Sequence, residues 1–133
     1  MKARIKLPPK RAALFNIPAE KSEKICEIFS QYGIDILFPD SKDRGEKIGY
    51  LLGVPGYTKT GAAAENGTEN AELILFADLD EKTLDIALAG LRENGVTVRF
   101  KAVLTKYSID FTYSELMGHM LSEEKKIAEN NSK

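Results

Sequence analysis

The sequence predicts a single α/β domain in which two β-α-β units form one four-stranded sheet, followed by a C-terminal helix. Two continuous apolar runs, Ala12 to Phe15 and Leu73 to Ala77, are typical of strands that are covered on both faces. An amphipathic helical pattern, a glycine and an alternating strand follow each run. The length of 133 residues suits one domain with its own core.

Two segments of the chain resemble each other. "AALFNIPAEKSEKICEIFSQYGIDILF" begins at Ala12, and "LILFADLDEKTLDIALAGLRENGVTVRF" begins at Leu73. Leu14 aligns with Leu75, and after a one-residue slip Gly33 aligns with Gly95. This pattern predicts an internal repeat of the order strand, helix, glycine, strand.

Each predicted helix has a recognisable start, a buried stripe and an end. Asn16 and Asp78 follow the apolar strands, where a polar side chain can cap the first amides of a helix. Gly33 and Gly95 stand where the chain must adopt a left-handed conformation to leave the helix. The apolar positions on one face of the two helices are Ile25, Ile28 and Phe29 in the first and Leu84, Leu88 and Leu91 in the second.

The second strand of each unit alternates between apolar and polar residues, which predicts one covered face and a place at the sheet edge. The residues expected on the covered face are Ile34, Ile36 and Phe38 in one strand and Val96, Val98 and Phe100 in the other. The two apolar strands then lie in the centre.

The segment between the units predicts a short helix and a mobile loop. Ile48, Leu51 and Leu52 are at helical spacing, and Gly53 ends the pattern. Asp43 with Glu46 forms a potential capping box. The stretch from about residue 56 to 71 is small and polar, which is typical of a surface loop.

Two topologies are compatible with this pattern. If the short helix crosses over the sheet, the strands are parallel in the order 2-1-3-4. If it forms only a side loop, a ferredoxin-like antiparallel α+β arrangement also places the apolar strands centrally. The two differ in whether the Phe15 and Phe76 strands run the same way.

The stretch "KAVLTKYSIDFTYSEL" predicts the join between the last strand and a final helix. Thr112 with Glu115 forms a capping box, and Phe111 with Leu116 forms a hydrophobic staple. The helix is expected to run toward Ile127. The domain is therefore expected to span 12–129, between a basic arm at 1–11 and a frayed tail at 130–133.

The amino-acid composition of the chain argues against some classes of binding partner. The formal net charge of −1 argues against a basic body that wraps nucleic acid. The single cysteine, Cys26, cannot form an internal disulfide, which favours a reducing, cytoplasmic location. No apolar run is long enough to cross a bilayer, so a membrane partner is not expected.

No motif predicts a catalytic residue, a metal site or a cofactor. His119 shares a helix face with Glu115 and Glu123, but a solvated face is the favoured interpretation because metal sites usually have more histidine or cysteine ligands. Cys26 lies mid-helix and is interpreted as an inert thiol. "GYTKTG" lacks the spacing of a phosphate loop.

One region could bring polar groups together. In open α/β sheets, ligands bind beyond the carboxyl ends of the strands. If the central strands are parallel, the polar residues at these ends would lie at one edge of the sheet. The candidate binding residues are Lys101, Thr105, Lys106, Ser108, Asn16 and Asp78.

The motifs "EKIGYLLGVPG", "LILFADLD" and "KAVLTKYSIDFTYSEL" resemble a small bacterial family known as domain of unknown function 3783, from about Ala12 to Glu124. Members of this family tend to have an asparagine in the turn and a tryptophan before the last helix, where this chain has Ser108 and Phe111. The resemblance implies that Lys101 and Thr105 are typical of the family, and it implies no catalytic residue.

Two functional hypotheses follow. The first is a non-enzymatic regulatory or protein-interaction module, because alternating edge strands offer a docking surface, including one for a homo-oligomer. The alternative is a small-molecule or nucleotide-binding protein, or an enzyme, with a site around Lys101 to Ser108. A weaker hypothesis is phosphate binding by the N-terminal arm.

Overall fold

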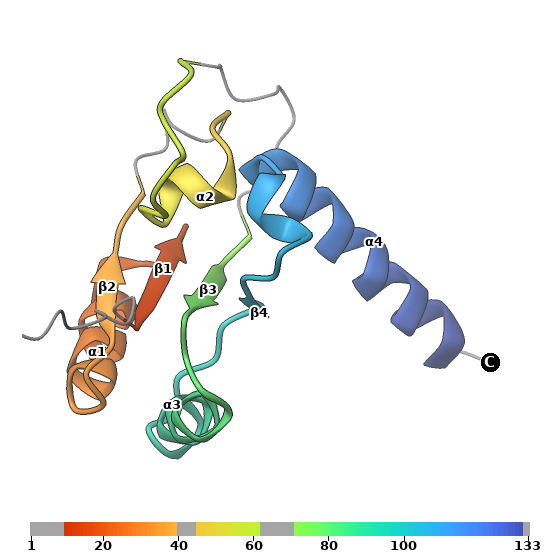
Figure 1. The fold of residues 1–133 in the computed structure, drawn as a ribbon. Coiled ribbons are helices and arrows are strands. Elements are labelled where there is room, and N and C mark those ends of the chain that lie inside the picture. Colours follow the sequence, from red (N-terminus) through yellow and green to blue (C-terminus); the bar gives the residue numbers. More distant parts are fainter. Residues whose placement is uncertain (1–9, 40–44, 62–70, 132–133) are drawn as a thin grey trace, which may run out of the picture.

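A four-stranded sheet forms the centre of the fold (Figure 1). The computed structural model describes residues 10–39, 45–61 and 71–131, with side chains up to residue 128. The strands are β1 (Arg11–Phe15), β2 (Asp35–Leu37), β3 (Leu73–Ala77) and β4 (Phe100–Val103). The helices are α1 (Ala19–Ser30), α2 (Ile48–Leu51), α3 (Glu81–Glu93) and α4 (Tyr113–Asn131), and η2 (Ser108–Asp110) is a 3-10 turn.

The strand order is β2-β1-β3-β4, which confirms the predicted order and the central position of the apolar strands. β1 is parallel to β2 and β3 is parallel to β4, but β1 and β3 are antiparallel, with Arg11 opposite Ala77 and Phe15 opposite Leu73. The sheet is therefore mixed. It is not all-parallel, because β1 and β3 are antiparallel. It is not ferredoxin-like, because the two strands of each β-α-β unit are direct neighbours in the sheet.

Helices cover both faces of the sheet. α1 and α3 lie together on one face, and α2 with the start of α4 lies on the other (Figure 1). Within β1, Ala12 and Leu14 belong to the core on the α1/α3 side, whereas Ala13 and Phe15 belong to the core on the α2/α4 side. This double burial explains why β1 has no polar alternation.

The first strands and the helix starts of the two β-α-β units have the same spacing along the chain. β1 and β3 begin at Arg11 and Leu73, and α1 and α3 begin at Ala19 and Glu81, so both pairs are 62 residues apart. Gly33 and Gly95 have the same separation. The alignment of Leu14 with Leu75, which are 61 residues apart, is therefore wrong by one residue, and no slip is needed to align Gly33 with Gly95.

The predicted glycine ends of α1 and α3 are confirmed. Gly33 and Gly95 have φ angles of 70° and 67°. Immediately after them, the Ile34 N–H donates to the Phe29 carbonyl at 3.2 Å and the Val96 N–H donates to the Leu91 carbonyl at 2.9 Å. These bonds satisfy carbonyls that the helix leaves open.

Asn16 and Asp78 do not cap helices, contrary to the prediction. Both have left-handed backbone angles, with φ of 59° and 63°, and the residues that immediately precede the helices are Pro18 and Asp80. Short polar side chains tolerate this conformation better than most residues, which explains why the two positions carry Asn and Asp.

Two phenylalanines depart from the predicted edge pattern. Ile34 and Ile36 pack toward α1 as predicted, but Phe38 follows the end of β2 and is 61% exposed. Phe100 is buried, but in the core on the α2/α4 side, whereas Val96 and Val98 belong to the core on the α1/α3 side. The buried side chains therefore switch from one face of the sheet to the other between Val98 and Phe100.

The start of α4 follows the prediction closely. The Thr112 N–H donates to Glu115 at 3.1 Å and the Glu115 N–H donates to Thr112 Oγ1 at 3.2 Å, which is a capping box. Phe111 and Leu116 belong to the same core, as the staple requires. The helix is longer than predicted, because it continues to Asn131.

α1 and α3 pack closely because α3 has no side chain at Gly90. A Cβ at Gly90 would lie 2.8 Å from Ile28 Cγ2, whereas a Cβ at Gly118 in α4 would have no neighbour within 4 Å. We expect Gly90→Ala to lower the free energy of unfolding by about 1–3 kcal/mol through overpacking. Gly118→Ala should raise it by about 0.5–1 kcal/mol through helix propensity. Urea denaturation of both variants measures the contrast, and equal effects would contradict the close packing.

Candidate functional site

The predicted site residues on β4 and its turn lie at one end of the sheet. Lys101 is exposed on β4, and Thr105, Lys106 and Ser108 follow in the turn. The Leu104 N–H donates to the Phe76 carbonyl at 2.8 Å, which keeps the two parallel strands in register to their ends. Asp78, directly after β3, therefore lies at this same end.

Asn16 lies at the opposite end of the sheet, because β1 is antiparallel to β3. Its Nδ2 donates to the Ala71 carbonyl at 3.0 Å and to the Tyr113 hydroxyl at 2.7 Å. These bonds connect the end of β1 to the segment before β3 and to the start of α4. The structure therefore does not bring the six candidate binding residues into one site.

Thr105 and Ser108 are bonded to each other. The Thr105 N–H donates to Ser108 Oγ at 3.0 Å, and the Ser108 N–H donates to Thr105 Oγ1 at 3.1 Å. Lys106 Nζ lies 5.3 Å from the centre of the Tyr107 ring. The bonds between Thr105 and Ser108 explain these two polar residues by turn formation.

Arg11 belongs to β1 and not to the basic arm in which the sequence placed it. Its side chain is buried, and Nη2 lies 2.7 Å from Asp78 Oδ2. Nη1 donates to the carbonyl of Leu52, at the end of α2. Arg11 thus ties the start of β1 to the end of β3 and to α2. The remaining positions of the arm, residues 1–9, lie outside the described residues.

Glu46 is a buried carboxylate that holds the loop before residue 62. It is 1% exposed. One oxygen accepts from the Thr60 N–H at 2.8 Å and from the Thr60 hydroxyl at 3.0 Å, and the other accepts from the Gly61 N–H at 2.7 Å. Glu46 therefore binds the loop and not the start of α2, in place of the predicted capping box; Asp43 lies outside the described residues.

The hydrogen bonds from Thr60 and Gly61 lower the pKa of Glu46, against the opposing effect of burial. A lowered folded-state pKa means that this contribution to stability is present above the usual pKa of a glutamate and is lost as the pH falls through the folded value. We expect the ¹⁵N shifts of Thr60 and Gly61 to titrate together at acidic pH. They should not titrate in Glu46→Gln, and titration in that variant would contradict the assignment.

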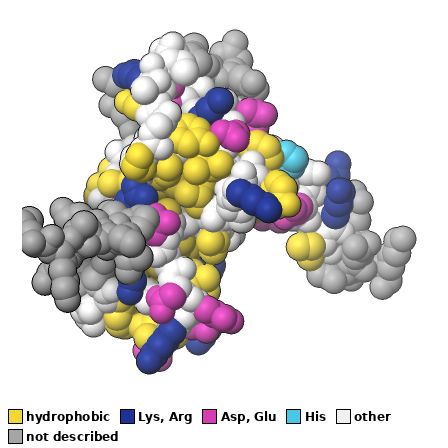
Figure 2. All heavy atoms as spheres, in the orientation of Figure 1, with side chains coloured by type: hydrophobic (Ala, Val, Ile, Leu, Met, Phe, Trp, Pro, Cys, Tyr) yellow, Lys and Arg dark blue, Asp and Glu magenta, His cyan; other side chains and the backbone are white. Residues whose placement is uncertain are grey.

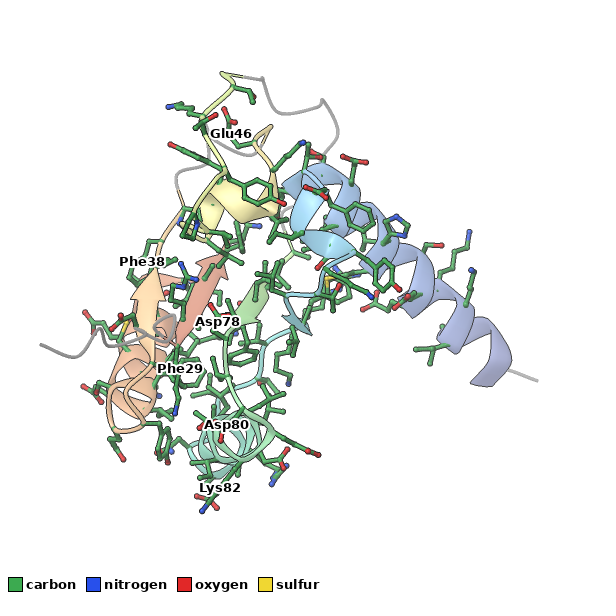
Figure 3. All side chains as sticks on the ribbon, viewed as in Figure 1. Phe29, Phe38, Glu46, Asp78, Asp80 and Lys82 are labelled. Atoms are coloured by element: carbon green, nitrogen blue, oxygen red, sulfur yellow. The ribbon has the colours of Figure 1, made fainter. Side chains whose placement is uncertain are left out.

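An open apolar groove lies along α1, and we call it the α1 groove. Its volume is about 620 Å³. Figure 3 shows Phe38 beside β2, at the outer side of the sheet. The lining residues are Ile17, Ala19, Ser22, Glu23, Cys26, Glu27 and Phe38. Two carboxylates line the groove, and no lysine or arginine is among these residues.

Cys26 is the half-buried thiol of this groove. Burial and then the negative charge of Glu23 raise its pKa. A thiolate is the nucleophilic form of cysteine, so these surroundings disfavour covalent chemistry at Cys26. In the groove it contributes apolar surface, in agreement with the sequence interpretation.

The His119 ring stacks on Phe111, with ring centres 4.9 Å apart. Within the described residues, no group of three histidine, cysteine or acidic side chains could hold a metal ion. Figure 2 shows hydrophobic atoms gathered in the middle of the view, where α2 and the start of α4 cover the sheet.

The comparison with family models concerns the C-terminal part of the fold. The model described as Domain of unknown function (DUF3783) matches residues 72–127. Residues 72–127 are thus similar to this family, and we call them the DUF3783 segment. The DUF3783 segment includes β3, α3, β4, η2 and most of α4. It is shorter than the region expected from the motifs, because "EKIGYLLGVPG" and the first β-α-β unit lie outside the match.

Neither the search of curated proteins nor the search of solved structures gave a match. In the part of the chain that the structure describes, no helix has the length and apolar character needed to cross a membrane.

The α1 groove was missed in the sequence analysis. The signal was present in Phe38, a large apolar residue directly before Pro39. Pro39 has no N–H to donate to a strand ladder, so it indicated that the strand ends by Phe38.

Proposed function

We propose that this protein is a non-enzymatic interaction module that binds a cationic peptide segment of a partner protein in the α1 groove. The observation that carries the proposal is the composition of the groove: an exposed phenylalanine and apolar walls beside two carboxylates. Such a surface favours an apolar anchor followed by basic side chains.

The spacing of the two carboxylates indicates how far apart the basic residues of the peptide should be. Glu23 and Glu27 are four residues apart on α1, which corresponds to about 6 Å along a helix axis. Side chains two residues apart on one face of an extended peptide are separated by about 6.7 Å. Two lysines at this spacing can therefore approach both carboxylates.

The position of Phe38 sets the place of the anchor. Phe38, Ile17 and Ala19 all come from the end of the sheet at which α1 begins. An apolar side chain at this end would be followed by lysines farther along α1. The expected motif is a leucine-type anchor with lysines two and four residues away.

The test uses the peptide acetyl-Thr-Leu-Thr-Lys-Thr-Lys-Thr-amide, labelled for fluorescence anisotropy. We expect it to bind more tightly than the same peptide with glutamates in place of lysines, and salt should weaken the binding. Phe38→Ala should raise Kd about tenfold, a loss of about 1.4 kcal/mol. Glu23→Gln with Glu27→Gln should remove the preference for lysine.

Equal affinities for the lysine and glutamate peptides, or no binding of either, would overturn the proposal. Lys101→Ala is the matched surface control, because Lys101 is exposed on β4 at the other edge of the sheet. It should leave the affinity unchanged.

The alternative, a small-molecule or nucleotide-binding protein or an enzyme with a site around Lys101 to Ser108, is not favoured by a specific observation. It depended on Asn16 and Asp78 lying at the same edge. A cytoplasmic location is part of the present proposal, on the basis of the single cysteine.

A further inference from the structure

β2 is a terminal strand of the sheet whose outer edge adjoins the α1 groove. It pairs with β1, and within the described residues no strand pairs with its other side. The side chains of Ile34 and Ile36 lie on the α1 side of the sheet, and the next even-numbered position, Phe38, lines the groove. The groove therefore lies on the same face of the sheet as the side chains of Ile34 and Ile36.

The backbone of β2 alternates between its two edges. The Asp35 N–H donates to the Lys10 carbonyl at 2.8 Å, which directs Asp35 toward β1. By the two-residue period of a strand, the N–H and C=O groups of Ile36 point to the open edge. These groups are available to an added strand.

We propose that the partner peptide binds as an additional strand, antiparallel to β2, with its anchor and lysines on the α1 side. This inference rests on the proposed function, because it specifies how the same groove is occupied. Main-chain bonds to Ile36 would supply part of the affinity, and the groove would select alternate side chains. The antiparallel direction is favoured because its ladder is slightly more stable.

The geometry fixes which peptide amides are needed. In an antiparallel pair, residues directly opposite each other point to the same face. A peptide residue opposite Ile36 therefore points toward the groove, and its N–H points toward β2. The leucine and lysine amides face β2, whereas the threonine amides face solvent.

The experiment compares two singly N-methylated forms of the lysine peptide. Methylation of the first lysine nitrogen should weaken binding at least tenfold, because it removes a ladder donor and blocks the edge. Methylation of the threonine nitrogen between the two lysines is the matched control and should change the affinity less than threefold.

Hydrogen exchange provides a second readout on the full chain. Peptide binding should protect the Ile36 amide and leave the Asp35 amide unchanged, since the latter is already bonded within the sheet. If the unmethylated peptide binds but both methylated forms bind equally well, strand addition is overturned and the interaction function stands. If the unmethylated peptide does not bind, the interaction function itself is overturned.

Discussion

Phe29→Ala is expected to lower the free energy of unfolding by about 3–5 kcal/mol. Phe29 is 0% exposed between α1 and the sheet, and its ring centre lies 5.7 Å from that of Phe76. Truncation would remove the buried ring and leave a cavity beside β3, because the surrounding core belongs to rigid helices and strands. Urea denaturation followed by circular dichroism measures the change.

The same truncation at Phe38 is the control. Phe38 is 61% exposed, so Phe38→Ala should alter stability by less than about 0.5 kcal/mol. The two variants therefore distinguish the stability contribution of a core phenylalanine from that of a phenylalanine in the groove. A large loss of stability in Phe38→Ala would contradict its exposed position and would also confound its use in the binding test.

Tyr113→Ala is expected to cost about 3–5 kcal/mol, by analogy with other buried aromatic truncations. Tyr113 is 0% exposed at the first turn of α4, and its ring centre lies 4.9 Å from that of Phe15. The residue holds the start of α4 against the end of β1. Thermal and urea denaturation should both report the loss.

Tyr113→Phe separates the ring from its hydroxyl. It keeps the packing but removes the acceptor for Asn16 Nδ2, which should cost about 1 kcal/mol. Similar losses for Tyr113→Ala and Tyr113→Phe would show that packing against Phe15 contributes little. The α4 interface described above would then be wrong.

Local chemistry made much of the fold predictable. The apolar runs identified β1 and β3, and Gly33 and Gly95 identified the ends of α1 and α3. The Thr112–Glu115 capping box identified the start of α4. Each of these features depends on a few neighbouring residues, so a sequence pattern can specify it.

The direction of the central strands was not predictable in this way. The antiparallel pairing of β1 with β3 is a contact between two segments that are far apart in the sequence. No short motif encodes that pairing. The antiparallel pairing places Asn16 and Asp78 at opposite ends of the sheet, so the convergence expected for parallel central strands does not occur.

Buried polar residues were also difficult to interpret from sequence. Arg11 stands in a run of basic residues, yet it is buried against Asp78 and Leu52. Glu46 matches a capping pattern, yet it accepts bonds from Thr60 and Gly61. In both cases the deciding partners come from distant parts of the chain.

The most direct test of the account is an NMR titration of the ¹⁵N-labelled protein with the lysine peptide. We expect the largest amide shifts at Cys26, Glu27 and Ile36, and none at Thr105 to Ser108. Shifts concentrated at Thr105 to Ser108 would contradict the account and favour a site at the end of β4. An unchanged spectrum at millimolar peptide would contradict the interaction function altogether.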